Sequence, residues 1–131
     1  MSDSTIDLRN LLDFIVKNKD VETRVNLDAD CKVKAEDPKP LIKIINYLIN
    51  YLKQITDNAI NISLTKQSEG CLLCLIVSTN QKKLPPLSEN LKKALKSFNA
   101  AIRIVFEEEK YVQLLICFCE GRIPDAVVIE V

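Results

Sequence analysis

Apolar residues recur at helical spacing in three segments of the chain. Ser4 or Thr5 is placed to cap the first predicted helix, and the Asp37-Pro38 pair begins a longer one that runs to about Asp57. The three apolar stripes are Leu8, Leu11, Leu12 and Ile15; then Leu41, Ile44, Ile45, Leu48, Leu52 and Ile55; and finally Leu91, Ala94, Leu95 and Phe98. Each stripe predicts a helix with one buried side.

Between these helices the pattern changes to the alternation typical of strands with one buried face. Residues 23–27 alternate in this way, and residues 28–36 are expected to be their hairpin partner, with Cys31, Val33 and Ala35 on one face. The run 71–77 is apolar on both faces, which indicates a central strand in a covered sheet. The other predicted strands are residues 60–64, 102–106, 111–119 and 126–131.

The order of the predicted elements indicates the fold class. Because consecutive strands are joined by short turns, the helices cannot all be crossovers between parallel strands. We therefore expect an α/β (α+β) two-layer sandwich, with a mixed, mostly antiparallel sheet and helices packed on one face. Residues 1–131 are expected to form a single domain, in which residues 121–131 add an extra strand or a tail.

The composition excludes much of the usual catalytic chemistry. The chain has no histidine, so it contains no Ser-His or Cys-His nucleophile pair and no phosphohistidine relay. Its two glycines, Gly70 and Gly121, lie too far apart to form a phosphate-binding loop. The 18 basic and 18 acidic residues balance, so no overall field attracts nucleic acid or an anionic membrane. The N-terminal residues lack the features of a signal peptide, and we expect a cytoplasmic protein.

The five cysteines are an odd number, which argues against a disulfide framework and favours a reduced protein. Cys71 and Cys74 form a CxxC pair, and Cys117 and Cys119 form a CxC pair, both within predicted strands. Alternation places Cys71 and Cys74 on opposite faces of the sheet, whereas a zinc knuckle needs its CxxC on a turn. We interpret the cysteines as small apolar residues of the core, with a metal or redox role as the alternative.

A polar stripe on the long helix carries a motif that points to a known family. Asn46, Asn50 and Lys53 recur at i, i+4 and i+7 within the segment NYLINYLKQIT, residues 46–56. This segment resembles the asparagine box of GHKL (Bergerat-fold) ATPases, and the element order over residues 5–119 is similar to that of the catalytic ATP-binding domain of bacterial sensor histidine kinases. The resemblance implies that Asn50 binds the magnesium ion of Mg-ATP. The alternative is an ordinary exposed face of an amphipathic helix.

The glycine motifs of that family are missing from this chain. After the strand at residues 71–77, Thr79 stands where the family has its adenine-binding aspartate, and Gln81 and Lys83 replace two glycines. Residues 88–93 stand at the second glycine box without a glycine, and too few residues precede them to form a nucleotide lid. Side chains at glycine positions crowd a nucleotide. The resemblance therefore implies a degenerate domain with a vestigial nucleotide site: Asn46, Asn50, Lys53 and Thr79.

From these features we expect a non-catalytic protein-interaction or regulatory module in bacterial signal transduction, with no cofactor. The alternative is a divergent ATPase or kinase domain that binds Mg-ATP through the retained asparagine box. The expected partner is a protein, such as a signalling kinase, a response regulator or a second copy of the chain; neither nucleic acid nor a membrane is expected. The first helix is one candidate contact surface. The candidate interface residues are Tyr47, Tyr51, Val127 and Ile129.

Overall fold

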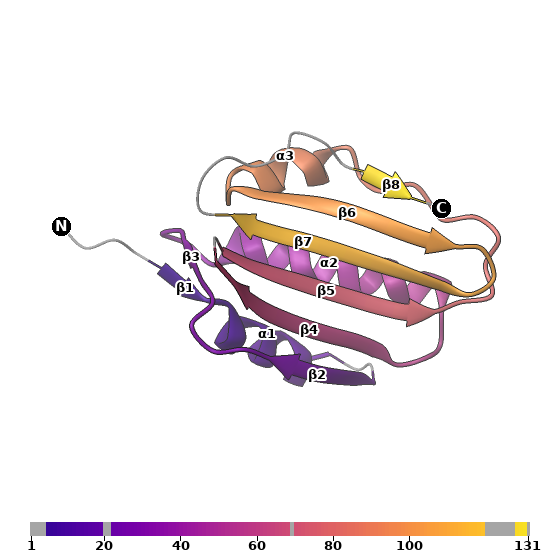
Figure 1. Cartoon of the computed structure of the whole chain (residues 1–131), viewed down its shortest axis with the longest axis horizontal. Helices are drawn as coiled ribbons and strands as arrows, with labels where there is room; N and C mark the ends of the chain where they lie inside the picture. Colours follow the sequence, from indigo (N-terminus) through magenta and orange to yellow (C-terminus); the bar gives the residue numbers. More distant parts are fainter. Residues whose placement is uncertain (1–4, 20–21, 69, 120–127, 131) are drawn as a thin grey trace.

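The computed structural model describes residues 5–19, 22–68, 70–119 and 128–130. A six-stranded sheet with the order β2-β4-β5-β7-β6-β8 is packed against helices, and a separate pair, β1-β3, lies beside the first helix (Figure 1). The elements are β1 Thr5–Asp7, α1 Leu8–Lys17, β2 Thr23–Leu27, β3 Lys32–Lys34, α2 Lys39–Ile55, β4 Ile60–Gln67, β5 Gly70–Ser78, α3 Asn90–Lys96, β6 Ala100–Glu107, β7 Tyr111–Cys119 and β8 Val128–Glu130.

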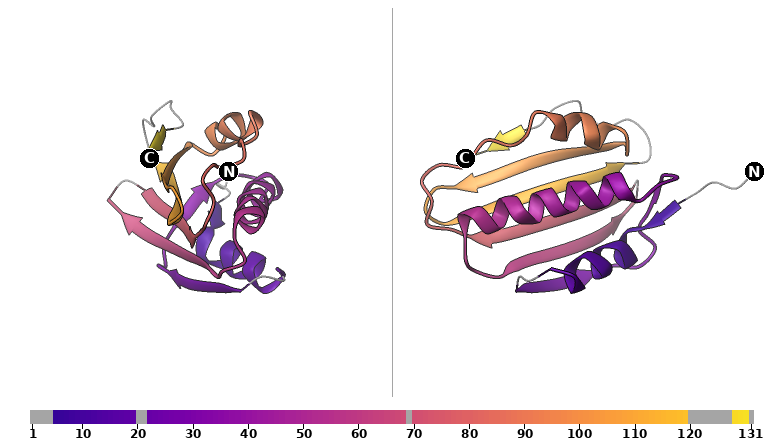
Figure 2. Two further views of the ribbon diagram at one scale, coloured as in Figure 1. Left: turned by 90° about the vertical axis from the view of Figure 1, so that its right-hand side faces the viewer. Right: turned by 180° about the vertical axis from the view of Figure 1, so that it is seen from behind.

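The main sheet is mixed and mostly antiparallel. The pairs β2-β4 and β6-β8 are parallel, whereas the three central pairs, β4-β5, β5-β7 and β6-β7, are antiparallel. The three helices of the described residues lie on one face of this sheet, which Figure 2 shows from behind and from the side. The predicted two-layer α+β sandwich is therefore confirmed.

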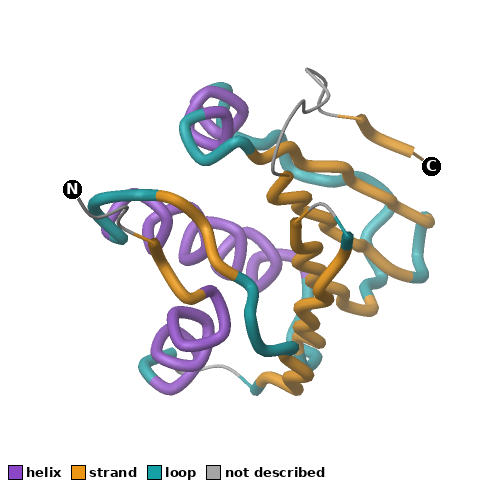
Figure 3. Tube along the Cα trace, turned by 60° about the vertical axis from the view of Figure 1, so that its left-hand side comes forward, coloured by secondary structure: helices purple, strands orange, loops and turns teal. Residues whose placement is uncertain are grey.

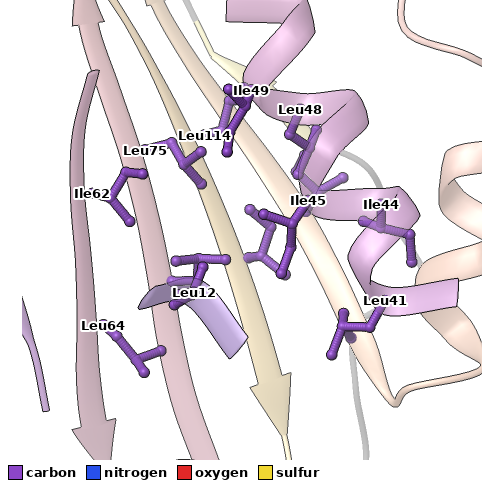
Figure 4. Packing of buried hydrophobic residues seen from close by; sticks show 14 of the residues in the cluster. Leu12, Leu41, Ile44, Ile45, Leu48, Ile49, Ile62, Leu64, Leu75 and Leu114 are labelled. Atoms are coloured by element: carbon purple, nitrogen blue, oxygen red, sulfur yellow. The ribbon is translucent and has the colours of Figure 1, made fainter. Parts of the chain in front are cut away.

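The core lies between α2 and the inner face of the sheet. Leu48 and Leu52 of α2 are fully buried, and all six apolar positions that define the predicted α2 stripe are buried, as expected from its spacing. Figure 4 shows Ile45, Leu48 and Ile49 directed toward the sheet that carries Leu75 and Leu114. Burial of these side chains removes a large apolar area from water and supplies the main driving force for folding.

Strand β5 is central, as predicted, because β4 and β7 flank it on either side. The expectation of a covered sheet is wrong for the described part of the chain, since the helices lie on one face only (Figure 2). The outward-facing Leu72, Cys74 and Ile76 of β5 are nevertheless half-buried. Their cross-strand neighbours on β7, which include Leu115 opposite Cys74, shield them from water without a second layer.

The N-terminal region differs from its sequence-based prediction in two ways. The residue that caps α1 is Asp7, whose Oδ1 accepts a hydrogen bond of 3.2 Å from the amide of Asn10. Of the two predicted caps, Thr5 belongs to β1 and Ser4 lies outside the described residues. Strand β3 pairs antiparallel with β1 and forms no hairpin with β2 (Figure 3). The neighbour of β2 in the sheet is β4, which runs parallel to it.

Cys31 and Cys71 form a disulfide that joins the segment before β3 to β5, with their Cα atoms 5.9 Å apart. Both residues are buried, as expected of core cysteines, but the prediction of a reduced protein without disulfides is wrong for this pair. Cys74 is a free cysteine on the opposite face of β5, as the alternation predicts. An odd number of cysteines excludes complete pairing and places no limit on an individual pair.

The C-terminal strand β8 pairs in parallel with β6, with Ile129 in register with Ile104. Residues 128–130 therefore extend the sheet of their own chain, which agrees with the expectation of an extra strand in residues 121–131. Val127 lies outside the described residues. None of the helices in the described part of the chain has the length and hydropathy that a membrane crossing requires.

Candidate functional site

The end of α2 and the end of β5 hold the candidate site together. The Thr79 hydroxyl donates a 2.7 Å hydrogen bond to the carbonyl of Ile55, the last residue of α2. In return, the Thr56 hydroxyl donates a 2.7 Å hydrogen bond to the carbonyl of Ser78, the last residue of β5. These reciprocal bonds satisfy backbone groups that a helix end would otherwise leave unpaired. They fix the helix that carries the asparagines relative to the loop that follows β5.

Thr79 is 4% exposed, so its polar side chain is buried. Besides donating to Ile55, its hydroxyl oxygen accepts a 3.1 Å hydrogen bond from the amide of Gln81. A hydroxyl has one hydrogen to donate, so this side chain has no donor left for a ligand. The structure thus gives Thr79 a structural role at the position where the resemblance places an adenine anchor.

Asn46 and Asn50 lie one turn apart on α2, with Asn46 half-buried and Asn50 exposed. The Oδ1 atom of Asn50 accepts a 3.2 Å hydrogen bond from the ammonium of Lys19, which follows α1. This oxygen is the atom through which an asparagine would bind Mg²⁺. The Lys19 ammonium already places a positive charge beside the Asn50 oxygen, and this charge would repel a divalent cation at the same oxygen.

Tyr47 and Tyr51 attach the loop after β5 to α2. We refer to residues 82–88 of this loop as the strap. The Tyr51 hydroxyl donates a 2.7 Å hydrogen bond to the carbonyl of Pro85, and the Tyr47 hydroxyl accepts a 2.7 Å bond from the amide of Ser88. The two rings lie 6.5 Å apart between centroids. The strap is therefore held along the same helix that carries the asparagines.

The two tyrosines are less available to a partner than the sequence suggests. Tyr51 is 4% exposed, so its prediction as an exposed interface residue is wrong, and Tyr47 is half-buried. Burial, with a smaller contribution from Tyr47, raises the pKa of Tyr51 to about 12. The Tyr51 phenol is therefore neutral at physiological pH and remains the donor to Pro85.

The β6-β7 turn fixes the loop that stands in place of the first glycine box. The amide of Thr79 donates to the carbonyl of Lys110, and the amide of Glu109 donates to the carbonyl of Gln81, at 3.0 and 2.9 Å. Lys82 also forms an exposed ion pair of 3.7 Å with Glu109. Two backbone groups of this loop are thus paired within the chain, where a phosphate-binding loop would present free amides.

The four predicted site residues are only partly brought together. Lys53 and Thr79 line one polar pocket of about 320 Å³ at the end of α2, with Asn80 and Gln81 on its other side. Asn46 and Asn50 do not line this pocket. In the described part of the chain, no three His, Cys, Asp or Glu side chains lie close enough to hold a metal ion together.

Sequence reasoning missed the contacts that occupy the site. The partners of these contacts are far apart in the sequence: 31 residues for Lys19 and Asn50, and 41 residues for Tyr47 and Ser88. No local sequence pattern therefore predicts them. The burial of Tyr51 could have been predicted from the sequence. Tyr51 lies three residues after Leu48 and four before Ile55, so it continues the apolar stripe of the helix.

Comparison of the sequence with models of protein families gave no match, and comparison with curated proteins gave none either. Solved structures do match. The histidine kinase domain of the E. coli osmosensor EnvZ has a TM-score of 0.73 at 9% identity, over 95% of this chain and 92% of that chain. The ATP-binding domain of PrrB from Mycobacterium tuberculosis has a TM-score of 0.68 at 12% identity, over 93% of this chain and 100% of that chain.

The histidine kinase AdeS of Acinetobacter baumannii matches equally well, with a TM-score of 0.68 at 10% identity over 93% of this chain and 69% of that chain. At such low identity the agreement concerns the fold. It reaches nearly the whole chain and includes the helix that carries the asparagine motif. The chain has the fold of these histidine kinase domains.

Proposed function

We propose that this chain is a non-catalytic protein-interaction module of bacterial signal transduction, derived from a histidine-kinase ATP-binding domain. The observation that carries the proposal is the contact between Lys19 and Asn50, because an ammonium occupies the oxygen that Mg²⁺ would need. Two further observations support it. The Thr79 hydroxyl already donates its hydrogen to the carbonyl of Ile55, and the strap is hydrogen-bonded to Tyr47 and Tyr51.

The outer side of α1 supports a protein partner. Phe14 is 58% exposed, which is unusual for a large aromatic side chain on a helix. It borders a shallow groove of about 580 Å³ that Ile6, Leu11 and Pro38 also line. Exposed aromatic residues beside apolar grooves are typical of protein interfaces. A signalling kinase, a response regulator or a second copy of this chain would each bring protein surface to this groove.

Isothermal titration with Mg-ATP tests the absence of nucleotide binding. We expect no saturable binding tighter than about 1 mM, an affinity worth only about 4 kcal/mol. The ATP-binding domain of PrrB, titrated in the same buffer, serves as the positive control. Tighter binding by this chain would contradict the proposal.

A divergent Mg-nucleotide-binding domain is the second candidate. Asn46 and Asn50 retain their one-turn spacing, and Lys53 and Thr79 share the polar pocket, which together favour it. Under this alternative, K19A removes the competing ammonium and increases the affinity for Mg-ATP. The matched control is K43A, which removes an exposed ammonium from α2. Under our proposal both variants remain without measurable binding, because the strap bonded to Tyr47 and Tyr51 and the paired loop after β5 still oppose a nucleotide in K19A.

A further inference from the structure

A second cavity lies beneath the strap and is separate from the predicted nucleotide residues. It encloses about 860 Å³ between the strap, the start of α3 and β6. Neither Asn46, Asn50, Lys53 nor Thr79 lines it. Its volume falls within the range of small-molecule sites. Its apolar walls are formed mainly by Leu84, Pro86, Leu87, Leu91, Ile104 and Phe106.

Three of the polar side chains at this cavity are lysines. Lys82, Lys83 and Lys92 line it, from the strap on one side and from α3 on the other. Lys82 is paired with Glu109, whereas Lys83 and Lys92 form no ion pair within the part of the chain that the structure describes. Both are exposed, so their ammonium groups are accessible to a ligand.

Two carboxylates, Glu89 and Glu108, also line the cavity and reduce the positive field. Further lysines of the strap and α3 offset these two carboxylates and make the local field positive again on that side. The segment 82–96 contains five lysines and a single acidic residue, Glu89. The turn that carries Glu108 is balanced in part, because Glu107 pairs with Lys110 at 2.8 Å and Glu109 pairs with Lys82. The field at the strap and α3 is therefore positive.

We propose that this cavity binds a small amphiphilic carboxylate, with its apolar body against Leu87 and Phe106 and its anionic head between Lys83 and Lys92. An apolar chain enters the cavity without leaving a polar group unpaired, since the walls offer few hydrogen-bonding groups. The head group stays at the mouth, where it is solvated and meets two ammonium groups. The ligand is a soluble monomer, because the cavity is sized for a single small molecule. This inference does not depend on the proposed function.

Isothermal titration with sodium dodecanoate, kept below its critical micelle concentration, tests the proposal. We expect saturable binding at one site, and binding about tenfold weaker for dodecyltrimethylammonium, which has the same chain and the opposite charge. The double variant K83E/K92E is expected to lose about tenfold in affinity for dodecanoate. The matched control K93E changes an α3 lysine that does not line the cavity, and its affinity stays close to that of the unmodified chain.

A steric variant tests the apolar walls separately. L87W places a larger side chain at a half-buried position of the strap and is expected to block dodecanoate while leaving the circular dichroism spectrum unchanged. The proposal is overturned by equal affinities for the anion and the cation, or by dodecanoate binding that neither K83E/K92E nor L87W weakens. Absence of saturable dodecanoate binding to the unmodified chain would also overturn it. So would binding to phosphatidylglycerol vesicles without binding of monomeric dodecanoate.

Discussion

The disulfide between Cys31 and Cys71 is expected to contribute strongly to the stability of the fold. It closes a loop across a sequence separation of 40 residues. The chain-entropy relation for a loop of that length gives about 13 cal/mol/K, or about 4 kcal/mol at 25 °C. Reduction leaves both buried side chains in place and removes only this constraint on the unfolded chain. The reduced protein should therefore unfold at a urea concentration lower by about 2 M.

Urea unfolding with and without tris(2-carboxyethyl)phosphine measures this difference on the same chain. The variant C31A/C71A should unfold at a lower midpoint and lose most of its response to the reductant. The control C74A removes the free cysteine and should keep the full response, because Cys74 lies on the other face of β5. Equal midpoints for the oxidised and the reduced chain would refute the reasoning, since a covalent cross-link must restrict the unfolded state.

Three further predictions concern single side chains. The pKa of Tyr51 is raised to about 12, so its neutral form stabilises the fold fully below pH 10, and that contribution is lost as the pH rises through 12. The difference in urea midpoint between the unmodified chain and Y51F should therefore shrink between pH 10 and pH 12. D7A should lower the free energy of unfolding by about 1 kcal/mol through loss of the α1 cap, whereas D13A, which removes an exposed i,i+4 ion pair, should cost less than about 0.5 kcal/mol. L48A should cost about 2–5 kcal/mol in the same assay, because Leu48 is fully buried; a loss below about 1 kcal/mol would contradict its place in the core.

Local periodicity predicted the elements whose stability depends on one long buried stripe. The stripe of α2 continues over more than four turns, so a shift of its buried side would expose several large side chains at once. The hairpins β4-β5 and β6-β7 were predictable for a related reason, since short turns and alternation fix their register. The partner of β3 was not predictable. Its three residues carry little pattern, and the pairing with β1 depends on where α1 packs.

The candidate site was predictable in its residues and unpredictable in their contacts. The spacing of Asn46 and Asn50 placed them on one face of the helix, as the structure confirms. Which groups meet that face depends on segments far away in the sequence. Lys19 comes from the end of α1 and Ser88 from the end of the strap. Neither contact changes the composition or the periodicity of the chain, so only the folded structure reveals that these polar groups are already paired.

These internal contacts bear directly on the energy of nucleotide binding. The proposed function assumes that a nucleotide at the asparagine face displaces the Lys19 contact and the two bonds that hold the strap to Tyr47 and Tyr51. Each hydrogen bond of this kind contributes about 1 kcal/mol, and the displaced groups would need new partners. Together the three bonds amount to about 3 kcal/mol, which approaches the 4 kcal/mol or so that a millimolar ligand gains in total.

The proposed function also expects a nucleotide to gain little binding energy in return. In the loop that replaces the glycine box, the amide of Thr79 donates to the carbonyl of Lys110 and the amide of Gln81 donates to the Thr79 hydroxyl, so neither of these two amides is free for a phosphate. The same strap roofs the lysine-lined cavity, with Pro85 and Ser88 fixed to α2 and Leu87 directed to its apolar walls. Under the proposed function, the contacts that hold the strap to α2 oppose a nucleotide on one side of the strap and stabilise the cavity on the other.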